Sequence, residues 1–83
     1  MNFRVYIELE MPILDKKYEL LVPIDRRIHE IISLLRENFP ELTQNYYQDK
    51  IPNLYNKSNG ELYDMNLIIK NSNIKTGTRL ILI

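Results

Sequence analysis

The side chains whose chemistry could support catalysis are few and widely spaced in this 83-residue sequence. His29, the only histidine, follows Ile28 on a predicted helix, so it faces away from the core and has no nucleophile near it. Ser33, on the same helix, has no triad partner. Glu8 and Glu10 share one face of a predicted strand, where two carboxylates could hold a metal or act as an acid–base pair. We interpret the histidine and both glutamates as exposed polar side chains and expect no catalytic residue.

The composition excludes several other kinds of site. Without cysteine, the protein has no disulfide, thiolate zinc site, iron–sulfur cluster or cysteine nucleophile. Its two glycines, Gly60 and Gly77, fall in predicted turns and match no phosphate-binding loop. The formal net charge is zero and the lysines and arginines are scattered, which disfavours a nucleic-acid-binding face. We therefore predict no enzyme, cofactor, metal, small-molecule substrate or nucleic-acid partner.

An alternation of apolar and polar residues marks the first two elements. Residues 3–10 alternate in this way, with Phe3 as the first member of the apolar face, which is the period of a half-buried strand. Residues 11–16 break the pattern as a turn, and residues 18–22 resume it. Two alternating runs with a short break between them predict an antiparallel hairpin.

A helix is predicted over residues 26–38. Asp25 precedes it as an N-cap, because its carboxylate can accept hydrogen bonds from the free N–H groups of the first turn. The apolar residues of one helical face follow at three- and four-residue spacing: Ile28, Ile31, Ile32, Leu35 and Phe39. Pro40 ends the helix, since a proline disfavours helical geometry at the residue before it.

The second half of the chain contains a loop, two turns and a closing strand. Residues 40–53 are polar, carry two prolines and predict a connecting loop. Residues 54–55 and 61–63 flank an Asn-Gly turn, and residues 78–83 form the last strand after a second turn. One helix must then cover one face of a four- or five-stranded mixed sheet. The predicted fold class is α+β, and the arrangement is a β-grasp.

The chain is expected to be one soluble domain, residues 1–83, in the cytoplasm. Its length suits a single domain with one modest core. The N-terminal stretch MNFRVYIELEM lacks the apolar core of a signal peptide, and no stretch approaches the roughly 20 apolar residues of a membrane helix.

Three stretches of the sequence together resemble a ubiquitin-like protein. They are the strand-to-helix passage YELLVPIDRRIHEIISLL, the turn region LYNKSNGELYDMNL and the closing NIKTGTRLILI, and the similarity spans nearly the whole chain. Among bacterial members, the sequence is most similar to the small YukD/EsaB-type proteins. That resemblance implies a cytoplasmic accessory component of type VII secretion, with a protein partner in the secretion machinery. A ubiquitin-like scaffold or regulatory domain without a link to secretion is the alternative.

The ubiquitin-type modifiers and the bacterial sulfur carriers of this fold carry a C-terminal Gly-Gly pair on a mobile tail. Only residues without side chains pass through the narrow channel in which a partner enzyme adenylates the terminal carboxylate. This sequence instead ends in LILI, in the alternating pattern of a strand. We therefore expect a structural C-terminal strand, and a modifier or sulfur carrier lacking its Gly-Gly tail is the less favoured alternative.

The parity of the strands predicts an apolar patch on the sheet face opposite the helix. If Leu80 and Leu82 face the helix, as the resemblance implies, the residues after each of them face outward. The residues assigned to the outer face, and to partner binding, are Tyr6, Leu21, Tyr55, Ile81 and Ile83. The first and last strands are central in this fold, so these side chains should lie together, inside a charged rim of Arg4, Lys17, Glu19 and Arg79. Exposed apolar patches usually bind proteins, whereas scattered single apolar residues are common and need no explanation.

Two arginines at the start of the predicted helix are a second candidate for partner binding. Arg26 and Arg27 oppose the positive end of the helix dipole, at a cost on the order of 0.3–1 kcal/mol for exposed positions. An acidic patch on a partner would offset this cost. The alternative is that Asp25 and nearby acids offset it within the chain.

Overall fold

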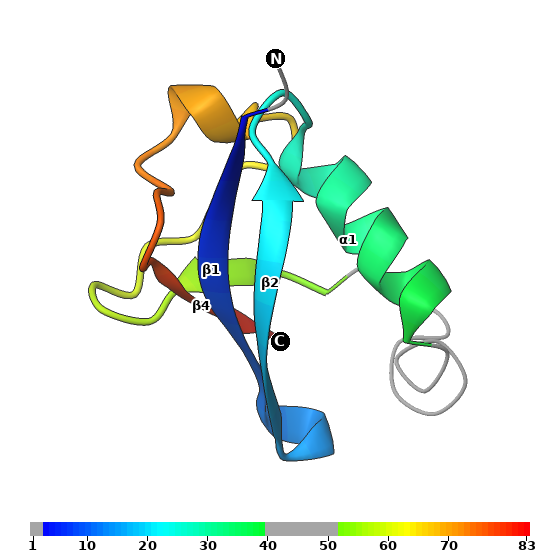
Figure 1. The fold of residues 1–83 in the computed structure, drawn as a ribbon. Coiled ribbons are helices and arrows are strands. Elements are labelled where there is room, and N and C mark those ends of the chain that lie inside the picture. The colour runs from blue at the N-terminus through cyan, green and yellow to red at the C-terminus, as the bar shows by residue number, and fades with distance from the viewer. Residues whose placement is uncertain (1–2, 40–51) are drawn as a thin grey trace.

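In the part of the chain that the structure describes, one helix lies on one face of a four-stranded sheet (Figure 1). The computed structural model describes residues 3–39 and 52–83. Its strands and helix, in chain order, are β1 (Arg4–Met11), β2 (Lys16–Pro23), α1 (Ile28–Asn38), β3 (Leu54–Asn56) and β4 (Arg79–Leu82). The order across the sheet is β2-β1-β4-β3, with β1 parallel to β4 and the other neighbouring pairs antiparallel. The predicted α+β class and the β-grasp with central first and last strands are confirmed, whereas most of the predicted loop over 40–53 lies outside the described residues.

The predicted hairpin forms β1 and β2, which pair antiparallel along the whole of both strands. A short 3-10 helix over Pro12–Leu14 connects them, and the Asp15 N–H donates to the Pro12 carbonyl at 3.0 Å. Asp15 has φ of 53°, a left-handed conformation that aspartate adopts more readily than most residues. The break in the alternating pattern therefore marks the turn correctly.

Helix α1 starts two residues later than the sequence predicts, at Ile28, and Asp25 is not its N-cap. Arg27 occupies the N-cap position instead. Because an arginine side chain has no hydrogen-bond acceptor, only one half of a capping box forms. Glu30 Oε1 accepts the Arg27 N–H at 3.2 Å.

The free N–H groups of the first helical turn are satisfied by a distant backbone segment. The N–H of Ile28 donates to the Leu67 carbonyl at 2.9 Å, and the N–H of His29 donates to the Met65 carbonyl at 3.0 Å. These two carbonyls accept hydrogen bonds from the first turn, the role that the sequence pattern predicted for the carboxylate of Asp25. The prediction was wrong because the capping groups lie far away along the chain.

The core lies between the sheet and α1. Its buried members are Ile7, Leu9, Met11, Val22, Ile28, Ile31, Ile32, Leu35, Leu54, Tyr63, Ile69, Ile74, Leu80 and Leu82. The inward parity predicted for the strands and the apolar stripe predicted for the helix are therefore correct. Phe3 is an exception, since it precedes β1, is 60% exposed and lines a surface hollow with Ile24 and Lys70.

A buried polar cluster holds the turn after β3. Asn56 Nδ2 donates to the Tyr63 hydroxyl oxygen at 3.0 Å, and the Tyr63 hydroxyl donates to Asn73 Oδ1 at 2.7 Å. Burial raises the pKa of Tyr63 above its ordinary value. The predicted Asn-Gly turn is present, and Gly60 has φ of 75°, a conformation that glycine adopts without strain.

Candidate protein-interaction surface

Two apolar pairs lie on the outer face of the sheet, opposite α1. Tyr6 and Leu21 are register partners across β1 and β2, and they are 43% and 57% exposed. Tyr55 and Ile81 are register partners across β3 and β4, and both are half-buried. Ile83, one residue past β4, is 53% exposed. All five side chains have the outward placement that strand parity predicts.

The two apolar pairs do not form one patch. In the sheet register, Ile81 lies beside β1 at a position four residues beyond Tyr6, which corresponds to roughly 13 Å along the strand. The row between them holds Glu8, with Glu19 beside it on β2 and Arg79 beside it on β4. The prediction that the apolar residues lie together is correct within each pair and wrong between the pairs. Parity fixes the face of each residue, but the register between β1 and β4 depends on the whole fold.

Ion pairs occupy the outer face between and beside the apolar pairs. Arg79 Nε lies 3.6 Å from Glu8 Oε2, and Lys57 Nζ lies 2.7 Å from Glu10 Oε2. The hydrogen bond from Lys57 lowers the pKa of Glu10 below its ordinary value of 4.5. The two glutamates, expected to be simply exposed, are therefore each paired with a cation and only partly exposed.

The hydroxyl group of Tyr6 is also held in place. It donates to Glu19 Oε2 at 3.0 Å, across the strands β1 and β2. This hydrogen bond to a carboxylate favours the protonated phenol and raises the pKa of Tyr6. The predicted rim residue Glu19 thus fixes the orientation of Tyr6, one of the exposed apolar side chains on this face.

Arg26 and Arg27 have partners within the chain. Arg26 Nη1 lies 3.1 Å from Glu30 Oε2, and Arg27 Nη1 donates to the Asn66 carbonyl oxygen at 2.6 Å. The pKa of Glu30 is lowered, mainly by the hydrogen bond from the Arg27 N–H and also by the Arg26 guanidinium. Glu30, rather than Asp25, is therefore the acid that pairs with the Arg26 guanidinium, whereas the Arg27 guanidinium is held by a backbone carbonyl. Both arginines lie at the start of α1, on the opposite side of the sheet from the outer-face pairs.

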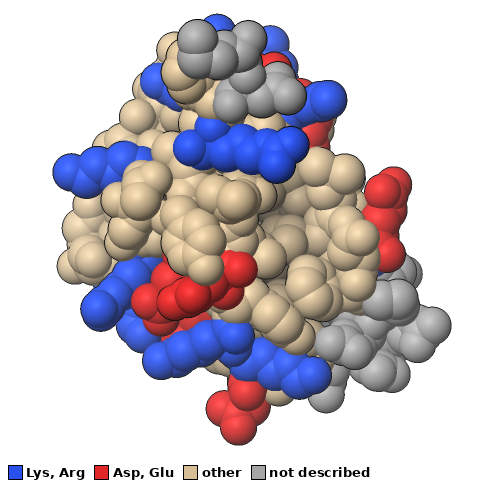
Figure 2. All heavy atoms as spheres, in the orientation of Figure 1, with Lys and Arg blue, Asp and Glu red and all other residues tan. Residues whose placement is uncertain are grey.

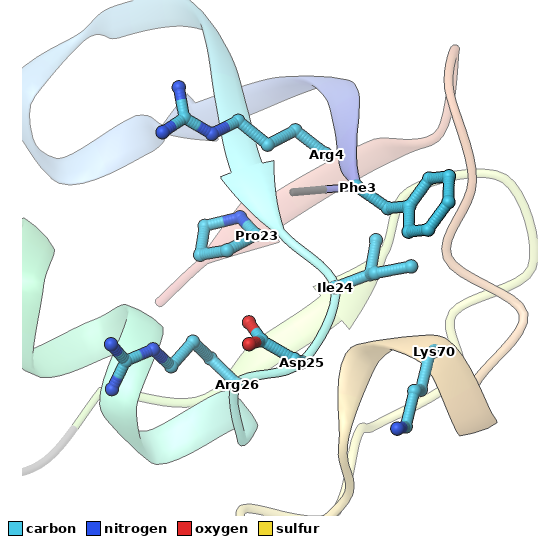
Figure 3. Close-up of a pocket in the computed structure, with 7 residues that line it drawn as sticks. All are labelled: Phe3, Arg4, Pro23, Ile24, Asp25, Arg26 and Lys70. Atoms are coloured by element: carbon cyan, nitrogen blue, oxygen red, sulfur yellow. The ribbon is translucent and has the colours of Figure 1, made fainter. Parts of the chain in front are cut away.

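A surface hollow of about 310 Å³ lies between the start of β1 and the start of α1 (Figure 3). Three cations line it, from Arg4, Arg26 and Lys70, together with the carboxylate of Asp25. Figure 3 shows that the charged ends of the three cationic side chains point in different directions. A site for an anionic ligand requires polar groups that converge on one point, and these groups do not converge.

An apolar groove of about 270 Å³ runs between β2 and α1. Leu20 and Val22 line it from the strand, and Leu34 and Leu35 line it from the helix. Figure 2, in the orientation of Figure 1, shows mainly uncharged atoms across the middle of this side of the molecule, with basic side chains above and both acidic and basic side chains below. The sequence patterns did not predict this groove. The residue in the sequence that indicates the groove is Leu34, an apolar residue outside the predicted apolar stripe of the helix. Leu34 is 44% exposed.

His29 and Ser33 are close on α1 without forming a catalytic arrangement. Ser33 Oγ donates to the backbone carbonyl of His29 at 3.0 Å, so this hydroxyl is bound to the helix backbone. Within residues 3–39 and 52–83, no three His, Cys, Asp or Glu side chains gather as metal ligands. Nor does any helix in those ranges have the length and apolar character needed to cross a bilayer.

No protein-family model and no curated protein matches this sequence. Solved structures do match it, at low identity. A ubiquitin-like domain of an Arabidopsis thaliana protein has a TM-score of 0.69 at 11% identity, over 96% of this chain and 76% of that chain. ATBAG1, solved in complex with HSP70, has a TM-score of 0.69 at 15% identity, over 95% of this chain and 39% of that chain. A chain of toluene 4-monooxygenase, solved with the inhibitor 4-bromobenzoate, has a TM-score of 0.76 at 6% identity, over 96% of each chain.

These similarities establish the fold. The chain has a ubiquitin-like β-grasp fold, with one helix on a four-stranded mixed sheet. The same fold occurs in a ubiquitin-like domain and in a chain of an oxygenase, so the fold by itself does not decide the function.

Proposed function

We propose that this protein is a non-enzymatic protein-interaction module that binds a partner through the outer face of its sheet. The observation that carries the proposal is the exposed pair of Tyr6 and Leu21 on a sheet face that α1 leaves open. Ion pairs lie beside the apolar side chains, as in the polar surroundings of many protein interfaces. The fold supports this proposal, because one structural relative was solved in complex with another protein.

The proposed partner is a component of a bacterial type VII secretion machinery, and the proposed location is the cytoplasm. The support is the similarity of three stretches of this sequence to the YukD/EsaB-type proteins, from YELLVPIDRRIHEIISLL to NIKTGTRLILI. In this role the protein is an accessory adaptor that docks non-covalently, and the outer face is its contact surface.

Affinity capture from the host lysate tests the proposal. N-terminally tagged protein is used once under native and once under denaturing conditions, and the bound proteins are identified by mass spectrometry. We expect secretion components in the native experiment alone, because a non-covalent contact does not survive denaturation. Adducts that survive denaturation and are joined through the C-terminus would overturn the adaptor proposal in favour of a modifier.

A pair of variants locates the contact. Ile81→Asp introduces a charge into the outer face and should lower partner affinity by about tenfold or more, as expected for a residue near the centre of an interface. Ile13→Asp is the matched control, because Ile13 is 46% exposed in the hairpin turn, away from that face. Circular dichroism confirms that both variants are folded. Equal losses in the two variants would contradict binding through the outer face.

A further inference from the structure

The two edges of the sheet differ in what covers them. Residues 61–63 run along the outer side of β3, where the Asn56 N–H donates to the Glu61 carbonyl at 2.8 Å and the Tyr63 N–H donates to the Leu54 carbonyl at 3.0 Å. Along β2, by contrast, the only strand pairing within the described ranges is the one with β1. Among the residues that the structure describes, the sheet therefore has one covered edge and one open edge.

The hydrogen bonds of β1 show which groups of β2 point away from the sheet. The Tyr6 carbonyl accepts the Gly77 N–H at 2.8 Å, on the side of β4. The Phe3 carbonyl accepts the Ile24 N–H at 3.2 Å, on the side of β2. Because the direction alternates along an antiparallel strand, the β2 residues bonded to β1 are Tyr18, Leu20 and Val22. The N–H and C=O groups that face outward are those of Lys17, Glu19 and Leu21.

We propose that this open edge pairs with β2 of a second copy of the chain, antiparallel and about a two-fold axis at Leu20. On the helix side of the joined sheet, Leu20 then meets Leu20 of the second copy. Tyr18 meets Val22 of the second copy, so all three contacts on this side are apolar. On the outer side, Glu19 lies opposite Leu21, and Lys17 lies opposite Pro23. The two four-stranded sheets become one sheet of eight strands.

Charge and length select this register among the possible ones. It pairs residues 17–23 of both copies and sets no like charges opposite each other. Displacing the second strand by two residues in one direction places Glu19 opposite Glu19, which is unfavourable. Displacing it by two residues in the other direction shortens the paired segment to residues 19–23. Because the contact is two-fold symmetric, each favourable pairing off the axis occurs twice.

The groove between β2 and α1 supplies apolar surface for the same contact. Both helices lie on one face of the joined sheet, each beside the new strand pair. The exposed side chain of Leu34 lies in this groove and would be covered by the second copy. The outer face stays open, and the two Tyr6–Leu21 pairs come to lie on one continuous surface. This pairing is separate from the partner binding proposed above and needs no other protein.

Single-cysteine variants test the register, since the chain has no cysteine of its own. Two thiols at position 20 would lie at a non-hydrogen-bonded pair with Cα atoms roughly 4.5 Å apart, within the range of a disulfide. The two copies of residue 18 would lie roughly 13 Å apart along the strands, and so would the two copies of residue 22. We expect oxidised Leu20→Cys to form a covalent dimer under conditions in which Tyr18→Cys and Val22→Cys do not. Cross-linking that is equal at the three positions, or strongest at 18 or 22, would overturn the proposal.

Sedimentation velocity tests the edge pairing itself. We expect wild-type protein to become dimeric as its concentration rises. Leu21→Pro removes an outward N–H that is not donated to any described residue of the same chain, so we expect loss of the dimer with the fold retained. Leu21→Thr loses the same side chain and keeps the N–H, and it should remain dimeric. A wild-type protein that stays monomeric up to millimolar concentration would overturn the proposal. This holds even if a different protein is then found to pair with the edge of β2.

Discussion

At the scale of single residues, Tyr63 joins two segments through one hydroxyl group. It accepts a hydrogen bond from Asn56 and donates one to Asn73. Tyr63→Phe removes that group and leaves the buried Asn56 amide without its acceptor, which should lower the free energy of unfolding by about 1–3 kcal/mol. Denaturant unfolding measures the change. Tyr55→Phe, on the outer face, is the control, and equal losses in the two variants would contradict a structural role for the buried cluster.

Glu10 makes the stability of the fold depend on pH. Lys57 lowers the pKa of this carboxyl group below its ordinary value of 4.5, so the folded chain binds the proton less readily than the unfolded chain. The stabilisation is complete above pH 4.5 and is lost as the pH falls through the lowered pKa. We expect Glu10→Gln to lose less stability on acidification than the wild type, measured by unfolding at several pH values. Glu37→Gln, exposed on α1, should keep the acid sensitivity of the wild type. The same pH dependence in both variants would contradict the role of the Glu10–Lys57 pair.

At the scale of elements, the start of α1 depends on Glu30 and not on Asp25. Glu30 accepts the N–H of Arg27 and pairs with the guanidinium of Arg26. Glu30→Ala should therefore lower the melting temperature and the helix signal in circular dichroism, because it removes both contacts. Asp25→Ala, which removes the predicted N-cap, should change neither. A larger loss for Asp25→Ala would show that the helix begins where the sequence placed it.

The elements themselves were predictable, because their signals are local. The alternation in residues 3–10 and 18–22 gives two strands, and the spacing from Ile28 to Leu35 gives one helix. The start of the helix was not predictable in this way. Its first N–H groups donate to the carbonyls of Leu67 and Met65. The sequence around residue 26 gives no indication that these distant carbonyls lie at the start of the helix.

The candidate surface shows the same division between local and long-range information. Parity correctly placed Tyr6 and Leu21 on the outer face, because side chains alternate along any strand. It could not show that Ile81 lies four residues further along β1, since the register of a parallel pair depends on a long crossover. The open edge of β2 could not be predicted either, because it follows from the strand order of the sheet.

At the scale of the whole molecule, the outer face has a defined layout for a partner. Two apolar contacts, at Tyr6–Leu21 and at Tyr55–Ile81, are offset by roughly 13 Å along the strand direction, with a charged row between them. A partner that covers the whole face needs two apolar contacts at that spacing and complementary polar groups in between. A partner with one apolar residue would use only one of the pairs.

Nuclear magnetic resonance mapping of the bound surface tests directly whether a partner binds to the outer face of the sheet. Isotope-labelled protein is titrated with the captured partner, and the shifted backbone amide signals are assigned to residues. We expect the largest changes on the outer face, at Tyr6, Leu21, Tyr55 and Ile81, with few changes in α1. Changes confined to α1, or to Arg26 and Arg27 at its start, would contradict binding through the sheet.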